Sequence, residues 1–318
     1  MNSINGVKIR RDDESIRSIG DRQHEIIRVN TETVNCVNPT VLKPIMEPKC
    51  VVGIDVSNVK TGETENGMVY AFRGSIVWKE EGSYRFVRCG PLIFHLQEDS
   101  MECDLQDGHG RTPILSRLRN IFERSLQLNA ARFFKDSIIL LDGSLTSGTP
   151  DNPSRLLSEL LEKSRKNGNT ILAISKSTKL VVNGVNIASL INGRRRPCFI
   201  DVDYYVRQMF PEHPVQLMGR VLVAKLAREG FPFRIDVDKG APISDPKTSL
   251  GVLLGNEVLE GGYPETLRLA HILSKFTESE IMAINSFLTG KYGLKTSLKF
   301  DLRKALFGPF CSGGGVAR

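Results

Sequence analysis

Two aspartates stand where two apolar segments of the chain end. Asp55 closes the apolar run within VVGIDVSN at residues 51–58, and Asp142 closes the run within SIILLDGSLTSG at residues 137–148. These runs predict buried strands, and a carboxylate at the end of a buried strand is costly unless a partner compensates it. Two such carboxylates on neighbouring strands could share a divalent metal ion, as in many nucleases that hydrolyse phosphodiesters. The alternative for each aspartate is a cap on the turn that follows.

Three further residues could serve the same chemistry. Glu123 has apolar neighbours on a predicted helix, His271 lies on a later predicted helix, and Lys176 ends a third apolar strand. Carboxylate and imidazole groups bind Mn²⁺ and related ions, and a lysine could neutralise a phosphate. Each residue has a plainer alternative. Glu123 could pair with Arg119 or Arg124 on the helix surface, His271 could pack in the core, and Lys176 could be solvated.

The order of the predicted elements brings the two aspartates together. Residues 68–96 predict an antiparallel meander with breaks at Arg73-Gly74 and Glu81-Gly82, and residues 113–134 predict an amphipathic helix. A second helix at 154–168 and the strand TILAISK at 170–176 follow the strand of Asp142. This is the layout of a ribonuclease H-like α/β fold, a mixed sheet flanked by helices. The first strand pairs there with the strand after the first helix, so Asp55 and Asp142 should be neighbours.

The rest of the chain is less regular. Residues 199–210 are compatible with strand or helix, 219–238 predict a hairpin, and 241–262 predict a glycine-rich loop. Helices are predicted at 264–276 and 278–288. The expected organisation is an N-terminal arm at 1–48, a nuclease domain with a C-terminal helical extension at 49–310, and a mobile tail at 311–318. An acidic segment at 98–112, with Asp99, Glu102, Asp104 and Asp107, is expected to be a solvated surface loop.

Composition narrows the class of protein. The 318 residues include 43 basic and 36 acidic side chains, a net charge of +7 that suits a polyanionic partner. None of the six cysteines forms a CxxC pair, so a zinc site is not expected. The first 25 residues lack the apolar stretch of a signal peptide, and no apolar run is long enough to span a bilayer. We therefore expect a cytoplasmic protein with no membrane partner.

Four strings in this order resemble the NurA nuclease family. They are GIDVSN around Asp55, LLDGSL around Asp142, AISKS around Lys176 and GGYPETLRLAHILSKF around His271. The resemblance implies a ribonuclease H-like core related to the PIWI domain of Argonautes. It also implies a manganese-dependent DNase that forms homodimers and pairs with the hexameric translocase HerA in DNA end processing, in archaea and some bacteria. The family usually has Asp-Gly-Ser at its first aspartate, where this chain has Asp55-Val56-Ser57.

The resemblance also assigns roles to residues. It implies that Asp55, Glu123, Asp142 and His271 hold Mn²⁺, or Mg²⁺. The place of Lys176 at the end of its strand, beside that of Asp142, adds the expectation that it neutralises the scissile phosphate. The implied activity is a 5′→3′ exonuclease on single- and double-stranded DNA with single-strand endonuclease activity, in end resection and double-strand break repair.

DNA contacts are expected at two further places. The basic run Arg194-Arg195-Arg196 could bind phosphates, although an exposed loop without a role is the alternative. Tyr204 or Tyr205 could stack on bases and could be the family's aromatic position. Two other functions stay open. One is a catalytically weak DNA-binding subunit that stimulates HerA, and the other is an RNA-cleaving or actin-like ATP-binding relative.

Overall fold

The computed structural model describes most of the chain. The described residues are 7–8, 28–31, 38–97, 114–148, 153–176, 181–182, 185–208 and 216–294. The acidic segment expected to be a loop at 98–112 and the tail expected at 311–318 lie outside them. From the expected N-terminal arm, the structure describes three short strands, β1 (Val7–Lys8), β2 (Arg28–Thr31) and β3 (Thr40–Val41).

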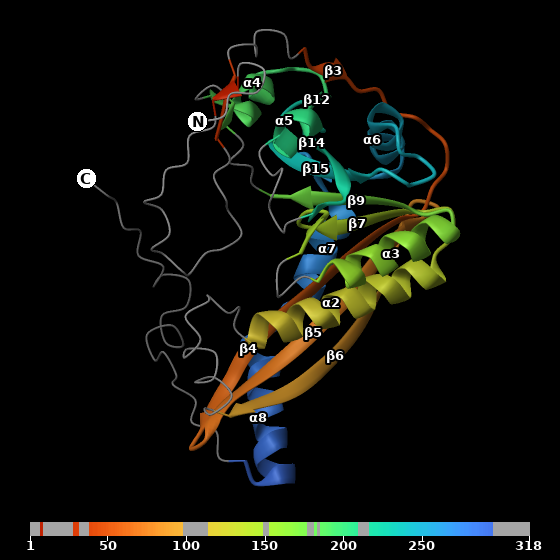
Figure 1. Ribbon diagram of the computed structural model, residues 1–318. Coiled ribbons are helices and arrows are strands. Elements are labelled where there is room, and N and C mark those ends of the chain that lie inside the picture. The colour runs from red at the N-terminus through yellow and green to blue at the C-terminus, as the bar shows by residue number, and fades with distance from the viewer. Residues whose placement is uncertain are drawn as a thin grey trace, which may run out of the picture.

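A large mixed sheet forms the centre of the molecule (Figure 1). Its strand order among the described residues is β3-β12-β14-β15-β9-β7-β4-β5-β6. The middle strands β4 (Val51–Thr64), β7 (Ile138–Asp142) and β9 (Thr170–Ser175) are parallel, as the sequence predicts. The strands on both sides of them pair antiparallel. The expected mixed sheet flanked by helices is therefore confirmed.

The meander differs from its prediction at one place. The expected turn at Glu81-Gly82 joins β5 (Gly67–Glu80) to β6 (Ser83–Gln97). The expected break at Arg73-Gly74 is wrong, because β5 runs through it with a bulge that shifts its register against β6. A Cβ atom on Gly74 would collide with the side chain of Leu126 on the helix above, so this glycine allows close packing and does not mark a turn.

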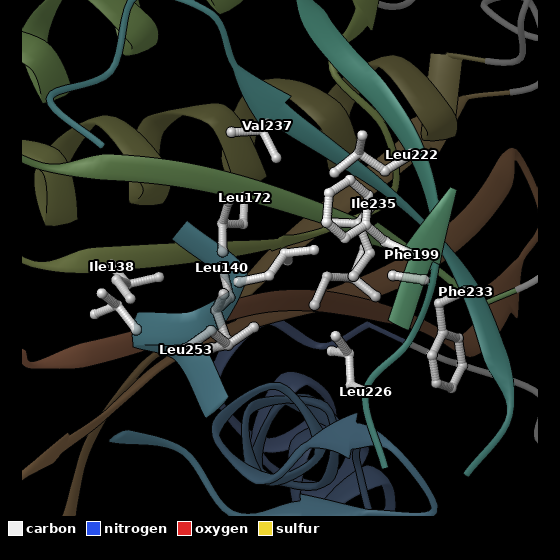
Figure 2. Close-up of a cluster of buried hydrophobic side chains, with 14 of the residues drawn as sticks. Ile138, Leu140, Leu172, Phe199, Leu222, Leu226, Phe233, Ile235, Val237 and Leu253 are labelled. Carbon is white, nitrogen blue, oxygen red and sulfur yellow. The ribbon is translucent and has the colours of Figure 1, made fainter. Parts of the chain in front are cut away.

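Helices cover both faces of the sheet. Helices α2 (Ile114–Phe133) and α3 (Ser154–Lys166) pack on one face, and α6 (Pro246–Asn256) and α7 (Glu265–Ser274) on the other. Successive strand residues point to opposite faces, so each strand contributes to two cores. The core under α6 and α7 is shown in Figure 2. It includes Ile138, Leu140, Leu172, Phe199, Leu222, Leu226, Phe233, Ile235, Val237 and Leu253. Each fully buried leucine or isoleucine contributes about 1.5–3 kcal/mol of transfer free energy.

Helix α6 corrects the loop expected at 241–262. Asp245 caps its N-terminus by accepting a hydrogen bond from the Thr248 amide at 2.8 Å, and Pro246 occupies the first turn. Two glycines lie where the helix meets the preceding segment. A Cβ on Gly251 would be 2.8 Å from the Ile45 side chain, and one on Gly255 would collide with the Ile45 backbone. The glycines that suggested a loop therefore serve close packing inside and at the end of a helix.

The remaining described elements follow or refine the predictions. Residues 199–210 contain both alternatives, because β12 (Cys198–Asp201) is followed by α5 (Asp203–Gln208). The predicted hairpin is β14 (Gly219–Lys225) and β15 (Pro232–Asp238). Shorter elements are β8 (Thr146–Ser147), β10 (Val181–Val182), β11 (Val185–Asn186), α4 (Ile187–Asn192), β13 (Gln216–Leu217), β16 (Leu259–Glu260) and β17 (Tyr263–Pro264).

The last helix, α8 (Glu278–Tyr292), is held to the long strands by a buried arginine. Arg73 on β5 donates a hydrogen bond to the Lys275 carbonyl at 3.0 Å and forms an ion pair with Glu280 at 2.9 Å. The hydrogen bond that Arg73 donates to the Glu280 carboxylate is the main cause that lowers the pKa of Glu280 to about 2. None of the helices that the structure describes has both the length and the apolar composition needed to cross a membrane.

Candidate metal centre

Asp55 and Asp142 lie side by side at the ends of two central strands. Strands β4 and β7 are parallel and pair Ile54 with Leu141, so the next residue of each is an aspartate. Both side chains share the sheet face with α7, because side chains alternate along a strand and Val51, Ile138 and Leu140 point to that face. Asp55 is 3% exposed, whereas Asp142 is half-buried. The juxtaposition expected from element order is present.

Helix α7 brings His271 onto Asp55. The helix backbone crosses β4 so closely that a Cβ on Gly53 would lie 2.7 Å from the carbonyl carbon of Thr266. From this position the Nδ1 atom of His271 lies 3.2 Å from Oδ2 of Asp55. The Ser274 hydroxyl donates to the same oxygen at 2.6 Å. The close crossing of α7 thus determines which groups surround the buried carboxylate.

The three side chains could share one cation. One ligand atom from each of Asp55, Asp142 and His271 lies within 4.8 Å of the other two. Two carboxylates and an imidazole are donors that Mn²⁺ accepts, and Mg²⁺ prefers the carboxylates. A buried carboxylate such as Asp55 also needs compensating charge. The donor set, its spacing and its burial fit a divalent ion.

Glu123 approaches the same place from the other face of the sheet. It lies half-buried on α2 and accepts a hydrogen bond from the Gln127 amide at 2.9 Å. Burial is the main cause that raises the pKa of Glu123 to about 7, and the charges of Asp55 and Asp142 raise it further against the opposing effect of Arg124 and Arg119. Glu123 is therefore electrostatically coupled to the two aspartates, although it is not one of the three residues with closely grouped ligand atoms.

Lys176 pairs with the more exposed aspartate. Its Nζ atom lies 2.7 Å from Oδ2 of Asp142, and its side chain is 49% exposed. The same Nζ atom is 5.6 Å from the centre of the Tyr263 ring. The ammonium group thus stands beside the carboxylates and remains open to solvent, where an anionic substrate could meet it.

The predicted DNA-contact residues lie at two different ends of the sheet. The run Arg194–Arg196 is exposed and leads into β12, whose first residue pairs with Lys225. Following the strand directions from β12 to β7 places this run at the end of the sheet where Asp142 lies.

Tyr204 and Tyr205 are on α5, which follows the opposite end of β12. Tyr204 lines an open pocket of about 620 Å³ with Asp201, Asp203, Arg207, Gln208, Arg220, Lys239 and Ser244. The two tyrosines are therefore not part of the metal centre, and their contact with DNA stays a prediction.

Sequence reasoning did not single out Ser274 and Tyr263. Both lie in the string GGYPETLRLAHILSKF, which was selected for its histidine. A possible signal for Tyr263 was the Gly261-Gly262 pair before it, which is typical of a tight hairpin turn that fixes the next side chain. Ser274 follows His271 at a spacing of three, which places both on one side of a helix.

Comparisons with known proteins identify the fold. No family model matches this sequence, and no curated protein matches it. Among solved structures, the NurA nuclease from Sulfolobus solfataricus aligns with a TM-score of 0.53 and 17% identity, over 80% of this chain and 88% of that chain. A second NurA structure aligns with a TM-score of 0.53 and 10% identity, over 82% of this chain and 93% of that one. The chain has a NurA-like fold. The fold expected from the four sequence strings is thus confirmed.

Proposed function

We propose that this chain is a divalent-metal-dependent DNA nuclease. The observation that carries the proposal is the grouping of Asp55, Asp142 and His271, with ligand atoms within 4.8 Å of one another, on a NurA-like fold. Asp55 is buried and Glu123 is electrostatically coupled to it, so a divalent cation bound beside them would compensate the buried carboxylate. A centre of this kind suits the hydrolysis of a phosphodiester.

Each residue has a distinct part in the proposed reaction. Asp55, Asp142 and His271 hold the metal, and Glu123 adds a fourth ligand from α2. One or two Mn²⁺ or Mg²⁺ ions held by these residues would supply Lewis-acid chemistry, activating water and neutralising charge on the leaving 3′-oxygen. Lys176 releases Asp142 when the cation binds and places its charge on the scissile phosphate. Ser274 keeps the Asp55 carboxylate in position through its hydrogen bond.

We propose the finer activity and the partners from the family resemblance. The substrate is DNA, cut as a 5′→3′ exonuclease on single and double strands and as an endonuclease on single strands. The partner is the HerA translocase, in end resection and double-strand break repair.

A homodimer is part of the same proposal. One observation supports it. Strand β6 is the last strand of the sheet and exposes Phe86, Val87, Leu92 and Ile93. An edge strand with an apolar surface of this kind is suited to pairing with another chain.

A nuclease assay tests the proposal. The full chain is incubated with 5′- and 3′-labelled single- and double-stranded DNA in Mn²⁺, in Mg²⁺ and in EDTA, with and without HerA. We expect cutting that needs the metal and that falls by more than about 100-fold in Asp142→Asn, because a ligand to the catalytic ion is lost. The labels give the polarity.

The matched control is Asp136→Asn. Asp136 is exposed and has a φ of 50°, a conformation that asparagine also adopts, so this variant should cut at the wild-type rate. No cutting by the wild-type chain in Mn²⁺, alone or with HerA, would contradict the nuclease proposal. It would favour a DNA-binding subunit on the same fold.

A further inference from the structure

One buried amide on helix α2 joins a proposed metal ligand to an arginine. Gln127 is 1% exposed, and its Nε2 atom donates a hydrogen bond to Oε1 of Glu123 at 2.9 Å. Its Oε1 atom accepts a hydrogen bond from Nη1 of Arg124 at 2.6 Å. The other buried residues of α2 are apolar, namely Leu126, Ala130 and Ala131. A polar side chain in such a position is costly unless its hydrogen bonds are made, and both ends of this amide are bonded to charged groups.

The charges on either side fix the direction of the amide. A guanidinium group has donors only, so the oxygen of the Gln127 amide must face Arg124. The N–H groups of the amide then face Glu123, whose ionised carboxylate has acceptors only. The reversed amide would set donor against donor and acceptor against acceptor. Gln127 therefore presents a donor to Glu123 in the ionised form that binds metal ions.

A second arginine ties the same helix to the strand of Asp55. Strand β4 continues beyond the end of β7, since its pairing with β7 ends at Ile54. Just past this point, the Val56 carbonyl accepts a hydrogen bond from Nε of Arg119 at 3.1 Å. Arg119 precedes Glu123 by four residues, so both lie on one side of α2. The helix is thus anchored one residue after Asp55, and Gln127 fixes the Glu123 carboxylate on the anchored helix.

The chemistry of this contact suits a metal ligand. A neutral donor holds a carboxylate in place without adding a positive charge to it, so the negative charge stays available to a cation. Ser274 makes the same kind of contact with Asp55, through a hydroxyl group. Hydrogen bonds from such neighbours to ligating groups commonly set the affinity of a metal site.

We propose that Gln127 is a positioning residue of the metal centre, whose amide holds the Glu123 carboxylate in the orientation in which it binds a divalent cation. This inference rests on the proposed function. Arg124 acts one step further from the metal, because it fixes the direction of the amide. The centre is then supported on both faces of the sheet, by Ser274 on α7 and by Gln127 on α2.

The test is a titration of the full chain and of Gln127→Met with Mn²⁺ by calorimetry, beside thermal unfolding in EDTA. Methionine fills a similar space and lacks the amide donor. We expect Mn²⁺ to bind Gln127→Met about 10- to 100-fold more weakly than the wild type. Gln127→Asn is a milder change that draws the amide back by one methylene, and it should weaken Mn²⁺ binding in the same direction. It decides the question if Gln127→Met does not fold.

A double-mutant cycle separates positioning from a structural role. Glu123→Gln removes the carboxylate ligand and leaves Asp55, Asp142 and His271 to bind Mn²⁺. Adding Gln127→Met to this variant should cause no further loss of Mn²⁺ affinity, because the residue it positions is already gone. An equal loss with and without Glu123 would overturn the positioning role.

Asn285→Leu is the matched control. Asn285 is another buried amide on a helix, α8, and donates to the Thr61 carbonyl at 2.6 Å. This variant should lose stability in EDTA and keep the wild-type affinity for Mn²⁺. An equal loss of affinity in Asn285→Leu would mean that stability alone governs binding, and the inference would be wrong.

The remaining outcomes distinguish this inference from the proposed function. Wild-type Mn²⁺ affinity in both Gln127→Met and Gln127→Asn would overturn the positioning role and leave the proposed function standing. Failure of the wild-type chain itself to bind Mn²⁺ would overturn the metal centre and this inference together.

Discussion

Lys176 and Asp142 form an ion pair that a metal ion must compete with. The Nζ atom lies 2.7 Å from the carboxylate, and the lysine side chain is half exposed. Exposed ion pairs of this kind contribute about 0–1 kcal/mol, so Lys176 can leave Asp142 at little cost. The lysine therefore has two separable effects. It weakens metal binding because it pairs with the Asp142 carboxylate, a proposed ligand. It strengthens catalysis because its positive charge can stabilise the scissile phosphate.

These two effects predict that Lys176→Gln raises the affinity for Mn²⁺ and lowers the rate of DNA cutting. Mn²⁺ should bind about 3- to 10-fold more tightly, because a competing charge is removed, which corresponds to about 0.7–1.4 kcal/mol. DNA cutting should fall by about 10-fold or more, because the phosphate loses a cation. Calorimetry and the cutting assay measure the two effects separately. Lys166→Gln, which breaks an exposed ion pair with Glu162 on α3, should change neither. If both quantities moved in the same direction for Lys176→Gln, the double role would be wrong.

At the scale of elements, the sequence predicts what depends on local pattern. The strands that end in Asp55 and Asp142 were predictable because apolar runs identify buried strands and element order then makes them neighbours. Local pattern did not predict that His271 lies on Asp55, because this contact depends on how closely α7 crosses β4, and only the family resemblance grouped the two residues. The glycines were misleading in two places. Gly74 and Gly251 are signals of a turn or loop in sequence, whereas in the fold they make room for Leu126 and Ile45.

The crossing of α7 over β4 can be tested at Gly53. A Cβ atom there would lie 2.7–2.8 Å from backbone atoms of Thr266 and Leu267, which cannot move aside as a flexible side chain can. We expect Gly53→Ala to lose about 1–3 kcal/mol of unfolding free energy in urea. It should also bind Mn²⁺ more weakly, because a displaced α7 carries His271 and Ser274 away from Asp55.

Gly290→Ala is the control, because it adds the same methyl group to a glycine away from the crossing of α7 and β4. Gly290 lies on α8 with open space around it, so alanine should be neutral or should stabilise by up to about 1 kcal/mol. Its affinity for Mn²⁺ should not change. Wild-type Mn²⁺ affinity in a destabilised Gly53→Ala chain would show that the centre tolerates a shift of α7, and would argue against His271 as a ligand.

At the scale of the whole molecule, the sheet places its candidate phosphate contacts on one end. The exposed run Arg194–Arg196 and the Asp142 carboxylate are at the same end, because the strands between them alternate in direction as the pairings require. They are separated by four inter-strand spacings, about 19 Å. Duplex DNA rises about 3.4 Å per base pair, so the run would meet phosphates five or six pairs from the cutting site. The fold thus places three of the basic residues behind the net charge of +7 at the end of the sheet that holds Asp142.

This placement predicts how salt affects DNA binding. Each phosphate contact adds about 0.9 to the slope of log affinity against log salt concentration on duplex DNA, so replacing Arg194, Arg195 and Arg196 by glutamine should reduce that slope by about 0.9–2.7. Fluorescence anisotropy of a labelled duplex in EDTA, at several salt concentrations, measures the slope without cutting. The control replaces Lys135, Lys163 and Lys166, which lie toward the other end of β7 and β9, and removes the same charge. Since both variants have equal net charge, a smaller slope in the arginine variant alone would locate the contacts. Equal slopes in the two variants would mean that the charge acts only through the field of the whole molecule, and the assignment of the run to DNA contact would be wrong.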